Sequence, residues 1–256
     1  MSVQSTSNGV LAASFAATMR TIVRSIDPQT PAEAAIVNDE IRLARGTSDI
    51  SDLALPVAAA LLAFACRFWI PASTLIGWTG AVAFVCALGW YAGHRLEFLQ
   101  HRGVSGARKW ALAHTTLATL FFVCWCSMGI FLWAPGNLLN HMFLILVLAA
   151  SLAGINSITA AHPATAFAAI LSHGAIMIFR PLVAGDALDL VLAGLCAIYC
   201  ALMANQAGVV YRTARRARAL QTEREELIGD LSEAKKESDR ERGRAVSAGR
   251  ARSGAR

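Results

Sequence analysis

Ionisable side chains within or beside long apolar stretches are the first candidates for chemistry in this sequence. Five of them fall near the ends of such stretches: Arg67, His141, Arg180, Asp186 and Asp189. A charged group at membrane depth is costly, so it is usually found where it has a partner or a function. If all five ends share one face of a membrane, two cations, two carboxylates and one imidazole occupy a single layer. That layer predicts a pocket or charge switch facing the periplasm, whose rearrangement would shift the last helix.

A second interpretation of the same five residues needs no function. Arg67 and Arg180 would extend their side chains to the outer head groups of the lipids. Asp186 and Asp189 would stand at the start of a helix, where the helix dipole favours carboxylates. Polar groups cost little near the interface, so both interpretations are open at this point.

Other residues that bind metals or carry catalysis are scattered. His114 and His173 lie inside apolar stretches, but no two histidines are spaced as ligands on one helix, and no carboxylate partner is evident. Cys124 and Cys126 are separated by one residue, and Cys196 and Cys200 lie one helical turn apart within an apolar stretch. Thiols in such places usually pack as small apolar side chains. We therefore expect no catalytic residue, no cofactor and no metal site in this chain.

The composition indicates a membrane protein. Of the 256 residues, 55 % are hydrophobic and only 16 % are charged, which is too apolar for an ordinary soluble domain. The net charge of +6 comes mainly from basic residues that flank apolar stretches, as the positive-inside rule requires of cytoplasmic loops. Nucleic acid is therefore not an expected partner, whereas the lipid bilayer is.

Six membrane spans are predicted, with both chain ends in the cytoplasm. Hydropathy and turn residues divide the chain into Leu53–Ile70, Ser73–Gly93, Ala111–Trp133, Leu139–Ala160, Ala164–Phe179 and a last span that begins at Ala187. A polar, basic loop from His94 to Trp110 separates the second span from the third, and the fifth span is short and contains His173. An even number of spans keeps nearly all of the flanking Lys and Arg inside.

The segment before the spans, residues 1–52, is predicted to be cytoplasmic. Its first basic residue, Arg20, follows a mildly apolar run instead of preceding it, which is the wrong order for a secretory signal peptide. A short helix should start at Pro31, because Thr30 and Glu33 form a capping box. Ile36, Val37, Ile41 and Leu43 would lie on its less polar side.

The last span is predicted to continue without a break into a charged helix. No proline occurs between Ala187 and Ser253. Beyond a basic cluster at the membrane surface, apolar residues recur at the three-four spacing of a coiled-coil seam, among them Leu220, Leu227, Leu231 and Ala234. The alternatives are a single charged helix or a disordered tail, since glycines and polar residues interrupt the seam. The expected fold is thus an all-α, polytopic bundle of six transmembrane helices (residues 53–210) that continues into a cytoplasmic signalling coiled coil (residues 211–256).

Several sequence features together resemble a known family. They include Glu40-Ile41-Arg42-Leu43, the junction Ala160-Ala161-His162-Pro163-Ala164, the entry Gly185-Asp186-Ala187-Leu188, and above all the run Glu226–Lys235 followed by Ala248–Ser253. In this order they resemble the N-terminal membrane region of bacterial sensor histidine kinases, many of them hybrid. The resemblance implies a homodimeric sensory module of a two-component system in the bacterial inner membrane.

The chain departs from that family where catalysis would begin. No histidine follows His173, so the phosphoacceptor is absent, and the remaining residues are too few for an ATP-binding domain. We therefore expect a sensor module cut or frameshifted at the junction, without kinase activity of its own. The alternatives are a small membrane transporter or channel, and a truncated partner that forms mixed dimers with an intact kinase or diguanylate cyclase.

Overall fold

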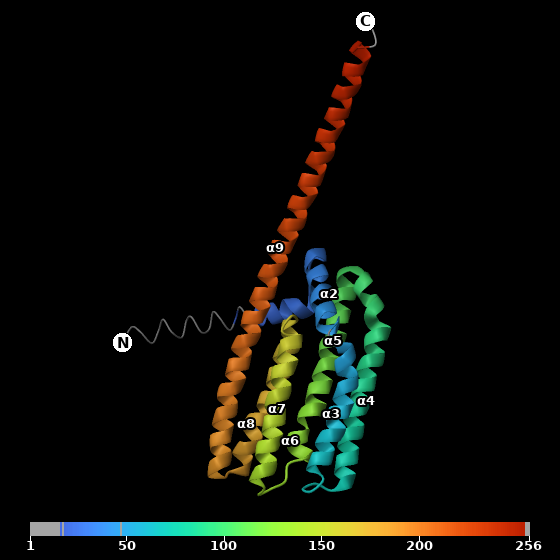
Figure 1. Cartoon of the computed structure of the whole chain (residues 1–256). Helices are drawn as coiled ribbons and strands as arrows, with labels where there is room; N and C mark the ends of the chain where they lie inside the picture. The colour runs from blue at the N-terminus through green and yellow to red at the C-terminus, as the bar shows by residue number, and fades with distance from the viewer. Residues whose placement is uncertain (1–15, 17, 47, 254–256) are drawn as a thin grey trace, which may run out of the picture. The chain divides into compact units, whose positions relative to one another are not determined.

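All of the regular secondary structure in the part of the chain that the structure describes is helical. The computed structural model describes residue 16, residues 18–46 and residues 48–253, and no strand occurs among them. In chain order, the elements are α2 (Pro31–Gly46), α3 (Ser48–Cys66), α4 (Ala72–Leu96), the 3₁₀ helix η1 (Glu97–His101), α5 (Gly103–Cys126), α6 (Met128–Phe131), α7 (Leu138–Thr159), α8 (Pro163–Ala184) and α9 (Ala187–Ser253) (Figure 1). The chain divides into two compact units, one ending at Tyr211 and one beginning at Arg212.

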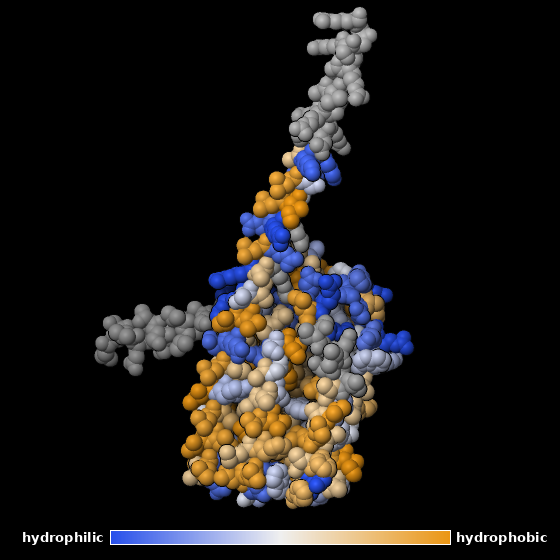
Figure 2. Space-filling view, in the orientation of Figure 1, coloured by the Kyte–Doolittle hydropathy of each residue, from blue (hydrophilic) through white to orange (hydrophobic). Residues whose placement is uncertain are grey.

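Five helical segments are long and apolar enough to cross a membrane. They are Ala72–His101, Gly103–Phe131, Leu138–Thr159, Pro163–Ala184 and Ala187–Gln221. The first predicted span, Leu53–Ile70, has only a shorter apolar helix, Ala54–Cys66. A multi-pass membrane protein is thus supported with five candidate spans. Large apolar side chains such as Leu61, Phe84, Leu146 and Val191 are exposed on these helices. Figure 2 shows apolar side chains covering much of the bundle in view, with polar ones gathered near α2.

Several predicted boundaries were wrong because helices continue through residues that usually end them. The polar loop from His94 to Trp110 is largely helical, since α4 runs to Leu96 and η1 leads almost directly to α5. Helix α8 passes through Pro181 and ends at Ala184, followed by the C-cap Gly185, whose φ of 81° is left-handed and favours glycine. The third span is broken at Ser127, between α5 and α6.

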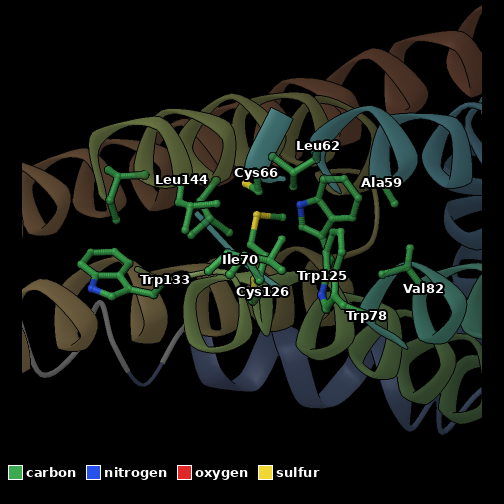
Figure 3. Packing of buried hydrophobic residues seen from close by; sticks show 14 of the residues in the cluster. Ala59, Leu62, Cys66, Ile70, Trp78, Val82, Trp125, Cys126, Trp133 and Leu144 are labelled. Atoms are coloured by element: carbon green, nitrogen blue, oxygen red, sulfur yellow. The ribbon is translucent and has the colours of Figure 1, made fainter. Parts of the chain in front are cut away.

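The largest apolar core lies among the helices of the first unit. It joins residues of α3 and α4, such as Leu62, Cys66 and Trp78, to Trp125 of α5 and Leu144 of α7 (Figure 3). Trp78 and Trp125 pack with ring centroids 5.9 Å apart, and the Trp78 indole N–H donates to the Ser127 hydroxyl over 3.2 Å. The Ser127 oxygen thus satisfies the buried indole N–H at the turn between α5 and α6.

Helix α2 packs against α5 at the end of the bundle where η1 lies (Figure 1). Half of the predicted capping box is present. The Glu33 N–H donates to the Thr30 hydroxyl over 3.2 Å, but the Glu33 carboxylate accepts from the Gln29 N–H instead of the Thr30 N–H. Val37 and Ile41 are buried as expected. The prediction was wrong for Ile36 and Leu43, which are 43 % and 54 % exposed, because the buried face follows positions 34, 37, 41 and 44.

The second unit contains the rest of α9, from Arg212 onwards. The predicted continuous helix from Ala187 to Ser253 is confirmed. Leu220, Leu227 and Leu231 are 66 %, 56 % and 70 % exposed, and Ala234 is exposed too. The coiled coil itself stays a prediction.

Candidate functional site

Hydrogen bonds of two asparagines fix the backbone of the connection between α6 and α7, which forms one side of the site. Asn137 caps α7, its side-chain oxygen accepting from the Asn140 N–H over 3.0 Å. The Asn140 amide then accepts from the Ala134 N–H over 2.8 Å and donates to the Leu132 carbonyl over 3.1 Å. These bonds hold the connection so that the Ala134 carbonyl faces the ring of His141.

His141 and Asp189 form a buried pair between α7 and the first turn of α9. Nδ1 of His141 lies 3.2 Å from Oδ1 of Asp189, and Nε2 lies 2.9 Å from the carbonyl oxygen of Ala134. The side chains are 2 % and 1 % exposed. Both ring nitrogens therefore face oxygen acceptors, and only a doubly protonated imidazolium can donate to both. An imidazolium paired with a carboxylate has this geometry, and so has a neutral imidazole that accepts at Nδ1 from a protonated Asp189 and donates from Nε2–H.

An aromatic ring and a second cation complete the layer. Trp133 stacks on His141, with ring centroids 3.9 Å apart and planes at 19°. The guanidinium carbon of Arg180 lies 5.1 Å from the Trp133 ring centroid, and its Nε–H donates to the Gly129 carbonyl over 3.2 Å. The electron-rich faces of the indole favour positive charge nearby. Arg180 is thus connected to the His141–Asp189 pair through Trp133.

Two of the five predicted residues do not join this pair. The guanidinium carbon of Arg67 lies 3.8 Å and 4.6 Å from the Phe64 and Phe68 ring centroids, on an exposed side chain. This arrangement fits a cation that extends toward lipid head groups. Asp186 is exposed at the start of α9, three residues before Asp189. His141, Asp189 and Arg180 are brought together, whereas Arg67 and Asp186 are not.

The sequence reasoning missed the residues that orient this pair. In the sequence, Trp133 is only the last residue of the third predicted span, and Ala134 is only part of the connection to the fourth. The signal that could have revealed more was Asn137, because asparagine is among the strongest N-cap residues. A backbone carbonyl that meets a ring nitrogen leaves no signal in the sequence.

Two more hydrogen bonds join α7 to α9 at deeper levels. The Tyr199 hydroxyl donates to the Ala149 carbonyl over 2.6 Å, and the Asn156 amide donates to the Met203 carbonyl over 3.3 Å. Asn156 thus bonds between helices, as polar residues in membrane spans often do. Along α9, the buried positions in the membrane region include Asp189, Ala193, Cys196 and Cys200, at spacings of four, three and four residues. The pair stands at the end of this buried face where α9 begins.

The other histidines make separate contacts. Nε2 of His173 lies 3.1 Å from the Ser151 hydroxyl, and Nδ1 lies 2.9 Å from the Ala169 carbonyl. The ring of His114 lies 5.8 Å from that of His162. Within the described residues, no three His, Cys, Asp or Glu side chains gather in a way that could hold a metal ion.

His162 fixes the N-terminal segment to the turn between α7 and α8. Its Nε2 lies 3.1 Å from the Ser25 carbonyl, and its Nδ1 lies 2.8 Å from the Thr165 hydroxyl. A neutral imidazole satisfies both contacts when Nε2–H donates and Nδ1 accepts. Burial lowers the pKa of His162 to about 4, against a smaller opposing effect of the Ser25 bond.

Comparisons with known proteins found no match: no family model, curated protein or solved structure is detectably similar to this chain.

Proposed function

We propose that this chain is the membrane-embedded sensory module of a signalling protein of the sensor histidine kinase type. The observation that carries the proposal is the buried contact of His141 with Asp189, because Asp189 lies in the first turn of the helix that continues to Ser253. A change at the outer ends of α7 and α9 then acts directly on the helix that leads to the output.

The proposed mechanism rests on the two states that such a pair can adopt. With the imidazolium and carboxylate in contact, α9 is held against α7 at its outer end. Loss of the imidazole proton, or a competing ligand for either group, removes one of the two hydrogen bonds of His141. The position of α9 is then set by the two deeper bonds to α7. A hydrogen bond to a charged group contributes about 1.5–3 kcal/mol. This is within the range of about 1–3 kcal/mol that is typical of coupling energies in allosteric proteins.

In this proposal Ala54–Cys66 also spans the membrane, which brings the number of spans to six. An even number places both termini on the cytoplasmic side of a bacterial inner membrane. The helix contains 13 residues, about 20 Å at 1.5 Å per residue, and it packs against α4. Arg67 and its two phenylalanines lie just beyond it and suit an outer interface. The exposed leucines of α9 would pair with a second copy of the chain, or with an intact kinase in a mixed dimer.

A chimaera tests the proposal. Residues 1–253 would be joined to the catalytic region of a histidine kinase so that the heptad register continues, and autophosphorylation would be measured in membranes. Asp189→Ala should shift the activity by about fivefold or more, whereas the exposed control Asp186→Ala should behave like the parent. Equal activity of the parent, both variants and a chimaera without residues 1–210 would contradict the proposal. Substrate flux in liposomes that contain residues 1–210 alone would favour the transporter alternative.

A further inference from the structure

A cavity of about 370 Å³ lies between α4 and α7, on the surface of α5. Its wall is mainly aliphatic and aromatic, and includes Trp90, Trp110, Phe121 and Trp125. The volume falls within the range of small-molecule sites, about 300–1,000 Å³. Neither the His141–Asp189 pair nor Arg180 contributes to it. The cavity is therefore distinct from the site described above.

The cavity extends in the direction of the helices. Its wall extends along α5 from Trp110 to Trp125, which corresponds to about 22 Å at 1.5 Å per residue. One leaflet with its head groups is about half of a bilayer of roughly 40–45 Å, or about 20–22 Å. A single acyl chain fits these dimensions better than a compact water-soluble molecule.

A cation stands at one end of the cavity. Arg45 of α2 lines the cavity; its Nη1–H donates to the Gly93 carbonyl over 2.9 Å, and its guanidinium carbon lies 5.3 Å from the Trp110 ring centroid. Among the side chains that the structure describes, which do not include those of residues 46–53, no carboxylate lies within ion-pairing distance of Arg45. A guanidinium that is oriented by a carbonyl and a ring, and that has further N–H groups to donate, suits an anionic oxygen group such as a phosphate.

Glycines keep the wall open along the cavity. A Cβ atom added at Gly89 or Gly154 would meet no other atom within 4 Å, although both residues line the cavity. At Gly93 an added Cβ would lie only 2.7 Å from Nη2 of Arg45, so the absence of a side chain at this position leaves room for the guanidinium. The wall also holds the indole N–H of Trp125, which is buried and has no partner among the described residues.

We propose that this cavity binds one anionic phospholipid of the cytoplasmic leaflet, with its phosphate at Arg45 and one acyl chain between α4 and α7. Arg45 belongs to the segment that the positive-inside rule places in the cytoplasm, so the head group and the guanidinium meet at the same interface. The bound lipid would connect α2 to the spans, because its head group contacts α2 and its chain contacts α4, α5 and α7.

Quenching of tryptophan fluorescence tests the proposal. The full chain in neutral detergent micelles would be titrated with phosphatidylglycerol whose acyl chains are brominated, and separately with the equally brominated phosphatidylcholine. We expect saturable quenching, with half-saturation at a mole fraction at least about fivefold lower for phosphatidylglycerol, as one charge-assisted hydrogen bond provides. Equal curves for the two lipids would overturn the proposal.

Matched variants separate the head-group contact from the acyl-chain contact. Arg45→Gln should remove the preference for phosphatidylglycerol, whereas Arg42→Gln, an exposed arginine of the same helix, should keep it. Gly154→Leu should fill the cavity and abolish saturable quenching by both lipids. Gly194→Leu adds the same side chain at an open position of α9 outside the cavity and should leave the titration unchanged. A preference that survives both Arg45→Gln and Gly154→Leu would place the lipid elsewhere.

Discussion

Replacing Asp189 with alanine would remove the carboxylate that His141 contacts. The imidazole would then be either a buried cation with no counter-charge, or a neutral ring with one proton for the Ala134 carbonyl and an unpartnered Nδ1. Removing one member of a buried pair typically costs about 3–5 kcal/mol. We therefore expect Asp189→Ala to lower the free energy of unfolding by about that amount.

Asp189→Asn should cost far less, because the amide can replace the carboxylate in a different protonation state. Nε2–H of a neutral His141 would donate to Ala134, and the new amide N–H would donate to Nδ1. An exchange of one satisfied hydrogen bond for another should change the free energy of unfolding by about 1 kcal/mol. The control Asp186→Asn changes an exposed carboxylate near the same helix end and should stay within about 0.5 kcal/mol.

The assay is unfolding in mixed micelles of neutral detergent and dodecyl sulfate, followed by the far-ultraviolet circular dichroism of the helices. The expected order of unfolding free energies is parent and Asp186→Asn highest, Asp189→Asn slightly lower, and Asp189→Ala lowest. If Asp189→Ala unfolded together with Asp186→Asn, the pair would contribute nothing, and the geometric reasoning would be refuted.

Three further predictions concern other parts of the chain. The free energy of unfolding should fall by up to about 3 kcal/mol as the pH falls from about 6.5 to about 4. In this range the unfolded state binds a proton at His162, whereas the folded state, with the pKa of His162 lowered to about 4, does not. This pH dependence should disappear in His162→Gln and persist in the exposed control His101→Gln, as measured from unfolding curves at several pH values. Gly106→Ala should lower the free energy of unfolding by about 1–3 kcal/mol, because the new Cβ would meet the Leu99 carbonyl oxygen. Gly80→Ala is the matched control: its Cβ would meet nothing within 4 Å, so in the same assay it should raise the free energy of unfolding by about 0.5–1 kcal/mol. Aspartate in place of the three seam leucines should abolish cross-linking between chains in membranes, unlike aspartate at three exposed polar positions of α9; the leucines are Leu220, Leu227 and Leu231.

Helix type and the approximate position of the spans could be predicted from the sequence, because apolar length and turn residues are local signals. The continuous helix from Ala187 to Ser253 is the clearest case, since no proline interrupts it. Boundaries were less predictable. Arg180 and Pro181 suggested the end of a helix, but the helix continues to Ala184, where Arg180 is held by the Gly129 carbonyl and the Trp133 ring.

The candidate site could be predicted only as a layer. Charge and depth identified His141, Arg180 and Asp189, but the same reasoning included Arg67 and Asp186, because which side chains turn inward depends on the rotation of each helix. The choice between a buried pair and simple helix capping for Asp189 required its contact with His141. The role of Ala134 depends on a backbone carbonyl whose direction the Asn137 and Asn140 bonds set.

Disulfide trapping between two chains that carry Leu227→Cys shows whether the His141–Asp189 pair controls the position of α9. The six native cysteines are buried or partly buried, so the exposed engineered thiol should react first. In inner-membrane vesicles, adding Asp189→Ala should change the rate of disulfide formation at position 227 by about fivefold or more, and adding the exposed control Asp186→Ala should not change it. Equal rates for all three proteins would contradict the account, because α9 would then be insensitive to the pair.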